Sequence, residues 1–260
     1  MLESEPCSSE RPTAGGRHSL VVVLGMHRSG TSCLAGMLQS HGLFLGEVHV
    51  RDSFNLKGNR ENDRIVALNN AVLEHSGGAW NAPPAVLSWT SVHEHLRDSI
   101  IGAFDLEACG AWGFKDPRLI FTLPFWLPAI AGRARFVGTF RHPSQVIRSL
   151  CSRGRMSLTP DDAGFLWLAY NRRLLDFVDR FDIPLVSFDL PSQSYRARID
   201  TFAMHLGLPG VPDHPDPGFF EEDLRSDTGD CEEFAATKEQ SELHDELLAK
   251  ALLLPTRGNQ

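Results

Sequence analysis

Short apolar runs alternate along this chain with longer stretches in which apolar residues recur every three or four positions. The run at 20–24, LVVVL, is continuous and largely β-branched, which is typical of a strand buried on both faces. Further strands are predicted at 112–115, 135–140 and 183–188. The helical spacing predicts helices over residues 30–40, 61–75, 91–104, 123–130, 143–153, 161–180, 195–206 and 238–253.

Strands that alternate with helices predict an α/β fold, here a three-layer α/β/α arrangement around a central parallel sheet. One domain is predicted over 18–260, preceded by a polar and flexible tail at 1–17. Residues 209–230, rich in Pro, Asp and Gly, are predicted to be irregular. Because ligands of such folds bind at the carboxyl ends of the strands, the polar segments that follow the strands are the candidate site.

The segment 25–32, GMHRSGTS, follows the first strand and precedes a helix. This order directs backbone N–H groups and a helix N-terminus at one point, which makes an anion site. The spacing matches the phosphate-loop pattern GxxxxGK[ST], except that Thr31 stands where a nucleoside triphosphate-binding loop carries lysine. The sequence therefore predicts a phosphorylated ligand other than an ordinary nucleoside triphosphate.

Composition narrows the choice of partners and compartment. The 260 residues include 25 basic and 33 acidic side chains, and the net charge of -8 argues against nucleic acid and other polyanions as partners. Five scattered cysteines without a CxxC pair predict a reduced, cytoplasmic chain and no zinc site. No apolar run approaches the roughly 20 residues of a membrane span, so no membrane partner is predicted.

Two segments together carry a resemblance to a known family. GMHRSGTS and the later FRHPSQVIRSL, at 140–150, resemble the sulfotransferases that use 3'-phosphoadenylyl sulfate (PAPS). In that family the first loop holds the 5'-phosphosulfate, and a strand-to-helix segment supplies an arginine and, eight residues on, a serine for the 3'-phosphate. Arg141 and Ser149 have this spacing. GFKDPR, at 113–118, is similar to the KDP segment of the tyrosylprotein and glycan branches, so the motifs cover about 19–153.

The resemblance implies a P-loop-like fold and an activity. The implied reaction transfers a sulfuryl group from PAPS to a hydroxyl or amine of a small-molecule or saccharide acceptor, with PAPS as co-substrate and no metal. PAPS carries two anionic clusters, and the sequence offers two anion sites. Charge builds up on the departing phosphate oxygen, so fixed N–H donors and cations near that oxygen lower the barrier.

The resemblance also implies roles for single residues. Arg28 is assigned to the bridging oxygen and the 5'-phosphate, where its planar fork can hold two oxygens. Backbone and hydroxyl bonds to the 5'-phosphate are assigned to Ser29, Gly30, Thr31 and Ser32. Serine and threonine also cap helices, and the two readings are compatible because a cap site is an anion site.

The second anion site and the sulfuryl group are assigned to residues further along the chain. Arg141 and Ser149 are assigned to the 3'-phosphate, while Arg148 is interpreted as a solvent-facing charge. Lys115 resembles the lysine that stabilises the sulfuryl group, the alternative being a salt bridge to a neighbouring helix. Asp116 is expected to orient its loop or pair with an arginine.

The acceptor hydroxyl needs a general base, and several residues are candidates. Glu61, in GNREN, resembles a segment of bacterial members and is predicted to start a helix, where the dipole keeps a carboxylate ionised. Glu47 lies near the Gly-Glu-Glu run of the tyrosylprotein branch, whose second Glu is the base, but Val48 takes that second position. Glu61 and Glu47 stay open as the base, with His49 and then His27 ranked below them.

Two other readings of the chain remain. A kinase with a degenerate phosphate loop would need a lysine at position 31 and a ligand set for Mg²⁺. A non-catalytic nucleotide-binding protein would need neither. Trp80 and Trp89, in a Pro-rich stretch, are candidates to line an acceptor pocket, and otherwise belong to the core.

Overall fold

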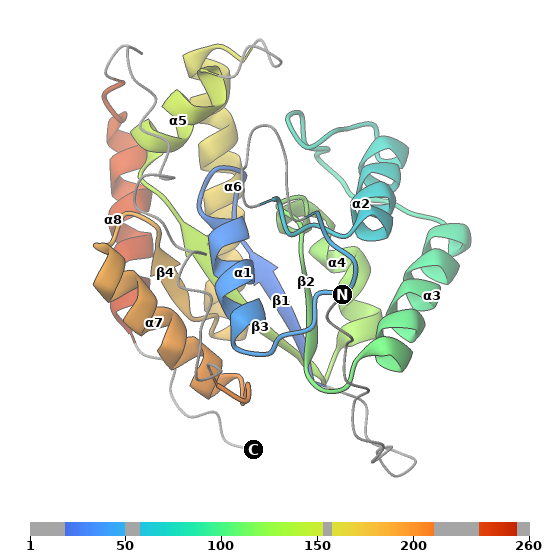
Figure 1. Cartoon of the computed structure of the whole chain (residues 1–260). Helices are drawn as coiled ribbons and strands as arrows, with labels where there is room; N and C mark the ends of the chain where they lie inside the picture. Colours follow the sequence, from blue (N-terminus) through green and yellow to red (C-terminus); the bar gives the residue numbers. More distant parts are fainter. Residues whose placement is uncertain (1–18, 50–57, 153–157, 211–233, 254–260) are drawn as a thin grey trace.

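The computed structural model describes residues 19–49, 58–152, 158–210 and 234–253 (Figure 1). Within them, one parallel sheet has the strand order β2-β1-β3-β4. Its strands are β1 (Leu20–Leu24), β2 (Trp112–Lys115), β3 (Ala134–Phe140) and β4 (Leu185–Ser187). Because all strand pairs are parallel, the carboxyl ends of the strands meet at one edge of the sheet.

Helices cover both faces of the sheet, as predicted. They are α1 (Thr31–Ser40), α2 (Asp63–His75), α3 (Ser91–Glu107), α4 (Leu119–Ile130), α5 (Pro143–Cys151), α6 (Pro160–Phe181), α7 (Ser192–His205) and α8 (Lys238–Leu252). Val21 and Val23 pack with α1 and α7, whereas Leu20, Val22 and Leu24 point to the opposite face. In Figure 1, α1 and α7 lie in front of the sheet and α6 lies behind it. The three-layer α/β/α prediction is confirmed.

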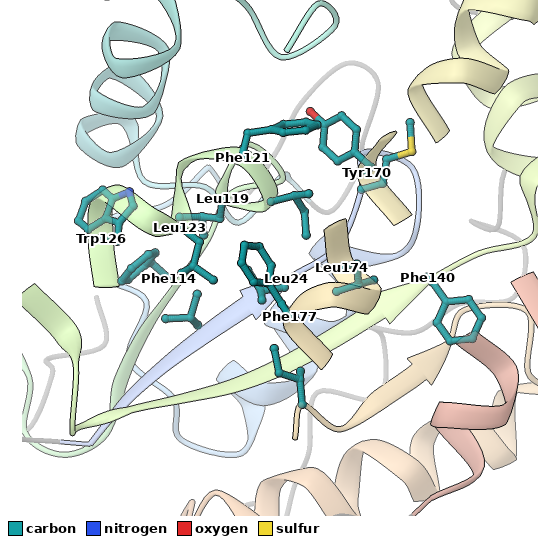
Figure 2. Packing of buried hydrophobic residues seen from close by; sticks show 14 of the residues in the cluster. Leu24, Phe114, Leu119, Phe121, Leu123, Trp126, Phe140, Tyr170, Leu174 and Phe177 are labelled. Atoms are coloured by element: carbon teal, nitrogen blue, oxygen red, sulfur yellow. The ribbon is translucent and has the colours of Figure 1, made fainter. Parts of the chain in front are cut away.

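The larger core lies between the sheet and the helices behind it (Figure 2). Leu24 of β1 and Phe114 of β2 are buried there. Leu123 of α4 and Leu174 and Phe177 of α6 come from the facing helices. This packing fixes the strand ends from which the candidate site is built.

Several boundaries differ from the predicted ones. α4 starts at Leu119 rather than 123, because the turn after β2 already makes helical bonds such as Leu119 N–H to the Asp116 carbonyl, at 3.0 Å. β4 starts after Pro184, which has no N–H to give to a sheet.

The start of α2 corrects the sequence prediction for Glu61. α2 begins at Asp63, and Asn62 is its N-cap, with its side chain accepting from Arg64 N–H at 3.1 Å. Glu61 therefore precedes the helix and does not occupy its first turn.

Some predictions fall wholly or partly outside the described residues: the tail at 1–17, most of the irregular segment at 209–230, and the helix end at Arg153. None of the described helices is both long enough and apolar enough to cross a membrane.

Candidate functional site

The turn between β1 and α1 is held in a special conformation. Arg28 and Gly30 have left-handed φ angles of 68° and 84°. Ser29 is buried between them; its N–H donates to the Met26 carbonyl at 3.3 Å, and its own carbonyl accepts from Thr139 Oγ1 at 2.9 Å. The Ser29 hydroxyl is shielded from solvent and has no hydrogen-bond partner among the described residues. A rigid turn with an unused buried hydroxyl suits a polar ligand, because such a group otherwise costs about 1–3 kcal/mol.

A side chain at position 30 would be strained by the left-handed φ and crowded by Phe188. A Cβ at Gly30 would lie 2.2 Å from the ring of Phe188. Gly30 is the N-cap of α1, so no side chain caps the helix where the predicted phosphate would bind. Thr31 is buried at the first position of α1, and the next residue, Ser32, donates from Oγ to the Asn59 carbonyl at 3.1 Å. The residues predicted to bind the 5'-phosphate therefore surround one helix N-terminus.

The two predicted anion sites touch one another. Arg28 Nε donates to Ser149 Oγ at 2.8 Å, and Ser149 is buried on α5. The guanidinium of Arg141 lies over the ring of Phe188, 5.3 Å from its centroid, and the same ring borders Gly30. The sequence assigned Arg28 to the bridging oxygen and the 5'-phosphate. In the structure its Nε also contacts Ser149, the residue predicted for the 3'-phosphate, so Arg28 lies where the two predicted sites meet.

Sequence reasoning missed the residue that holds Arg141. Asp189, just after β4, accepts from Arg141 Nε at 3.4 Å and from the backbone N–H of His142 at 2.6 Å. The available signal was an acidic residue directly after a predicted strand, at the edge where ligands bind. Asp189 thereby fixes both the arginine and the start of α5.

A second cluster forms around Lys115, at the end of β2. Its side chain is almost fully buried, and its Nζ donates to Glu61 Oε1 at 2.6 Å, to the Asn59 carbonyl at 3.0 Å and to Ser32 Oγ at 3.3 Å. Arg118 Nη1 lies 3.8 Å from the other oxygen of Glu61. The structure thus joins one candidate base, Glu61, to the lysine predicted to stabilise the sulfuryl group. Through Ser32 it also joins that lysine to the segment 25–32, which we call the phosphate turn.

Asp116 orients Arg118, in line with its expected role. The buried Asp116 carboxylate accepts from Arg118 N–H at 3.0 Å and from Arg118 Nη1 at 2.9 Å. Asn69 Nδ2 donates to the other carboxylate oxygen at 2.8 Å. Burial lowers the pKa of Arg118, but Asp116 and Glu61 outweigh burial and the pKa is raised overall. Arg118 therefore stays charged beside Glu61.

The other candidate bases are arranged differently. Glu47 is exposed, and its backbone carbonyl, not its carboxylate, accepts from Asn62 Nδ2 at 2.9 Å. His49 has a side chain that is 51% exposed, and its Nε2 lies 2.6 Å from Asp63 Oδ1. The backbone N–H of His49 donates to the Glu61 carbonyl at 3.4 Å, so the backbone at position 49 lies beside the backbone at position 61. Of the carboxylates considered, Glu61 is the one bonded to Lys115.

His27, ranked last among the candidate bases, packs against two aromatic rings. Its ring centroid is 4.6 Å from that of Trp80 and 6.0 Å from that of Tyr170. Burial, and then the positive charges of Arg118, Lys115 and Arg28, hold the pKa of His27 well below its ordinary value of 6.5. The imidazole is therefore neutral at neutral pH.

The two tryptophans considered for an acceptor pocket have separate environments. Trp89 Nε1 donates to Glu94 Oε1 at 2.9 Å, and its ring packs edge-on against Phe125 at 5.6 Å. Trp80 instead packs on His27 in the phosphate turn. Of the two, Trp80 is the one seen in contact with the candidate site, through His27.

A cavity of about 410 Å³ opens on the far side of Asp189, between β4, α5 and α8. His142 and His244 line it, with ring centroids 4.9 Å apart. Burial, and then His142, lower the pKa of His244, although Asp189 opposes this effect. Among the described residues, no group of three or more His, Cys, Asp or Glu side chains could hold a metal ion.

Comparison with known proteins identifies the family. The model of the sulfotransferase family matches residues 21–182, which include the phosphate turn, Lys115, Arg141 and Ser149. The chain belongs to the sulfotransferase family. A search of curated proteins gives no significant match. Together with the fold, membership of this family supports sulfuryl transfer as the general chemistry.

A solved structure agrees at the level of the fold. The sulfotransferase domain from the Synechococcus PCC 7002 olefin synthase is similar with a TM-score of 0.56, over 91% of this chain and 97% of that domain. The sequences are 16% identical, so the likeness concerns the fold alone.

Proposed function

We propose that this sulfotransferase moves a sulfuryl group from PAPS to a hydroxyl or amine of a small-molecule or saccharide acceptor. The observation that carries the proposal is the hydrogen bond from Arg28 Nε to Ser149 Oγ, at 2.8 Å. It joins the phosphate turn to the helix predicted to bind the 3'-phosphate. Because the two elements are in contact, one bisphosphorylated adenosine is long enough to engage both.

In this proposal the protein binds PAPS at two places, the 5'-phosphosulfate and the 3'-phosphate. Residues 29–32 and the N-terminus of α1 bind the 5'-phosphosulfate with N–H and hydroxyl donors. Arg141 and Ser149 bind the 3'-phosphate, and Asp189 keeps Arg141 in place. Arg28 lies between the two sites, and its fork can serve an oxygen of either. Positive charge near the departing phosphate oxygen lowers the barrier as that oxygen becomes negative.

The transfer step uses the Lys115 cluster. The acceptor oxygen forms a bond to sulfur while its O–H bond breaks, and the proton passes to the Glu61 carboxylate. The bond between sulfur and the phosphate oxygen breaks, and its electron pair leaves with the nucleotide. Lys115, already 2.6 Å from Glu61, neutralises the sulfuryl oxygens, and Arg118 keeps its ion pair with Asp116 once Glu61 has taken the proton.

The net charge of the chain favours an uncharged acceptor over a polyanionic one. A net charge of -8 disfavours a polyanionic acceptor such as nucleic acid or a heavily sulfated glycan. A neutral small molecule or simple saccharide fits better.

Thermal unfolding with added nucleotide tests the proposal. Adenosine 3',5'-bisphosphate at 100 times its dissociation constant is expected to stabilise the protein by about 2.7 kcal/mol, and ATP with Mg²⁺ to stabilise it much less. A preference for ATP with Mg²⁺ would favour the kinase reading. Binding of the bisphosphate without transfer of labelled sulfate from PAPS to any hydroxyl or amine compound would favour a non-catalytic protein.

A further inference from the structure

Trp80 is held rigidly beside the phosphate turn. Ala79 N–H donates to the Ala82 carbonyl at 2.9 Å, and Ala82 N–H returns a bond to the Ala79 carbonyl at 3.2 Å. The Trp80 carbonyl, within this turn, accepts from the buried Tyr170 hydroxyl of α6 at 2.9 Å. Trp80 is partly buried and packs against the larger core. A loop fixed from both sides therefore presents a tryptophan that keeps accessible surface.

His27 supplies a polar group next to this ring. Its Nε2 is shielded from solvent and has no hydrogen-bond partner within the described part of the chain. Buried polar atoms are nearly always satisfied in native proteins, and an unsatisfied one costs about 1–3 kcal/mol. A neutral imidazole has one nitrogen that donates and one that accepts. A hydroxyl group, which also does both, is a matching partner.

Charge at this place selects against an ionic partner. Lys115 is paired with Glu61, and Arg118 with both Asp116 and Glu61. These four side chains offer a cationic ligand no carboxylate that is not already paired, and an anionic ligand would meet the phosphosulfate of the donor at close range. An uncharged ligand meets neither penalty.

We propose that Trp80 and His27 form the acceptor subsite, in which an uncharged cyclic alcohol stacks its ring on Trp80 and hydrogen-bonds a hydroxyl to His27. Sugars and phenols share this chemistry, since both present a flat face and a hydroxyl group. The inference rests on the proposed function. His27 acts as a positioning residue, and Glu61 remains the group that takes the proton.

Labelled PAPS with a panel of methyl pyranosides and substituted phenols tests the subsite. For the panel compound that the wild-type protein sulfates best, Trp80→Ala and His27→Asn are each expected to raise KM about tenfold or more. The dissociation constant for adenosine 3',5'-bisphosphate should stay within about twofold, which also shows that the variants fold.

Two matched controls should leave KM unchanged. Trp89→Phe changes the ring that packs on Phe125, and His95→Asn changes an exposed histidine of α3. Which half of the panel is sulfated decides between a sugar and a phenol.

The possible results separate this inference from the proposed function. If the wild-type protein binds the bisphosphate but sulfates no panel compound, the acceptor class is wrong and the subsite is refuted. Unchanged KM values in both variants refute it as well, and so does a loss of kcat at constant KM for His27→Asn, because that result makes His27 catalytic. If the wild-type protein does not bind the bisphosphate, the proposed function fails and the subsite fails with it.

Discussion

At the scale of single residues, the site depends on a carboxylate held between two cations. Lys115 is only 3% exposed, and a buried ammonium group is tolerated when it is paired. Glu61 provides the pair at 2.6 Å, and the Asn59 carbonyl accepts a second bond at 3.0 Å. The same contact that stabilises Lys115 brings the candidate base to the phosphate turn.

Glu61→Gln is expected to reduce turnover about 100-fold or more while leaving the affinity for adenosine 3',5'-bisphosphate unchanged. The amide keeps an oxygen for Lys115 but cannot take the acceptor proton, and general bases contribute roughly 10²–10⁴ in rate. Steady-state kinetics with labelled PAPS measure the effect. Glu47→Gln is the control and should remain within about twofold of wild type. Equal losses in the two variants, or a loss only at Glu47, would make the assignment of Glu61 wrong.

Arg141→Met should abolish the preference for a 3'-phosphate. Hydrogen bonds to charged groups contribute about 1.5–3 kcal/mol, so the ratio of dissociation constants for adenosine 5'-monophosphate and adenosine 3',5'-bisphosphate should fall about 10- to 100-fold. Titration calorimetry measures both ligands. Arg135→Met, at an exposed arginine near the start of β3, the strand that Arg141 follows, is the control. A variant that binds both nucleotides more weakly but keeps the ratio would place the 3'-phosphate elsewhere.

At the scale of elements, the phosphate turn is where local sequence was most informative. The pattern predicted a turn between the first strand and a helix over 30–40. The structure begins α1 one residue later, at Thr31, and holds Gly30 at the N-cap with a left-handed φ of 84°. Strand and helix positions also followed from periodicity, because each depends on neighbours close in sequence. What the sequence did not disclose depends on contacts between distant segments: the Lys115–Glu61 pair, the hold of Asp189 on Arg141, and the separate environments of Trp80 and Trp89.

Gly30→Ala is expected to destabilise the protein by more than the conformational strain of its φ angle. Gly77 is a matched control, because its φ of 76° is similar but a Cβ there meets no atom within 4 Å. Gly77→Ala should therefore cost about 1–2 kcal/mol, the strain of a left-handed residue. Gly30→Ala adds a clash with Phe188 at 2.2 Å, which should raise the loss by about 1–3 kcal/mol. Urea unfolding of the two variants gives the comparison, and equal losses would show that Phe188 yields without cost.

At the scale of the whole molecule, two buried histidines connect the site to the stability of the fold. The pKa values of His27 and His244 are lowered in the folded protein, chiefly by burial. The unfolded chain therefore binds more protons than the native one when the pH falls below about 6.5, the ordinary histidine value. Stability that is fully present above this pH should be lost progressively below it.

The free energy of unfolding should accordingly decrease between pH 7 and 5.5, by at most about 1.4 kcal/mol per pH unit for each histidine. His27→Asn should flatten this decrease, because asparagine does not titrate. Urea unfolding at a series of pH values measures the slope. An unchanged slope in the variant would show that His27 takes up a proton as readily in the native protein as in the unfolded chain.

The fold and the family of the whole molecule agree with the sequence predictions. The family match and the parallel sheet confirm the expected fold and general chemistry. The cytoplasmic location, the single domain over 18–260 and PAPS as the donor stay predictions.

The most direct test is a crystal structure of the protein with adenosine 3',5'-bisphosphate. One nucleotide should span the site, with its 5'-phosphate on the turn at 28–32 and its 3'-phosphate within hydrogen-bond distance of Arg141 and Ser149. A nucleotide bound away from Arg141, or one that engages a single phosphate and leaves the other in solvent, would contradict the account.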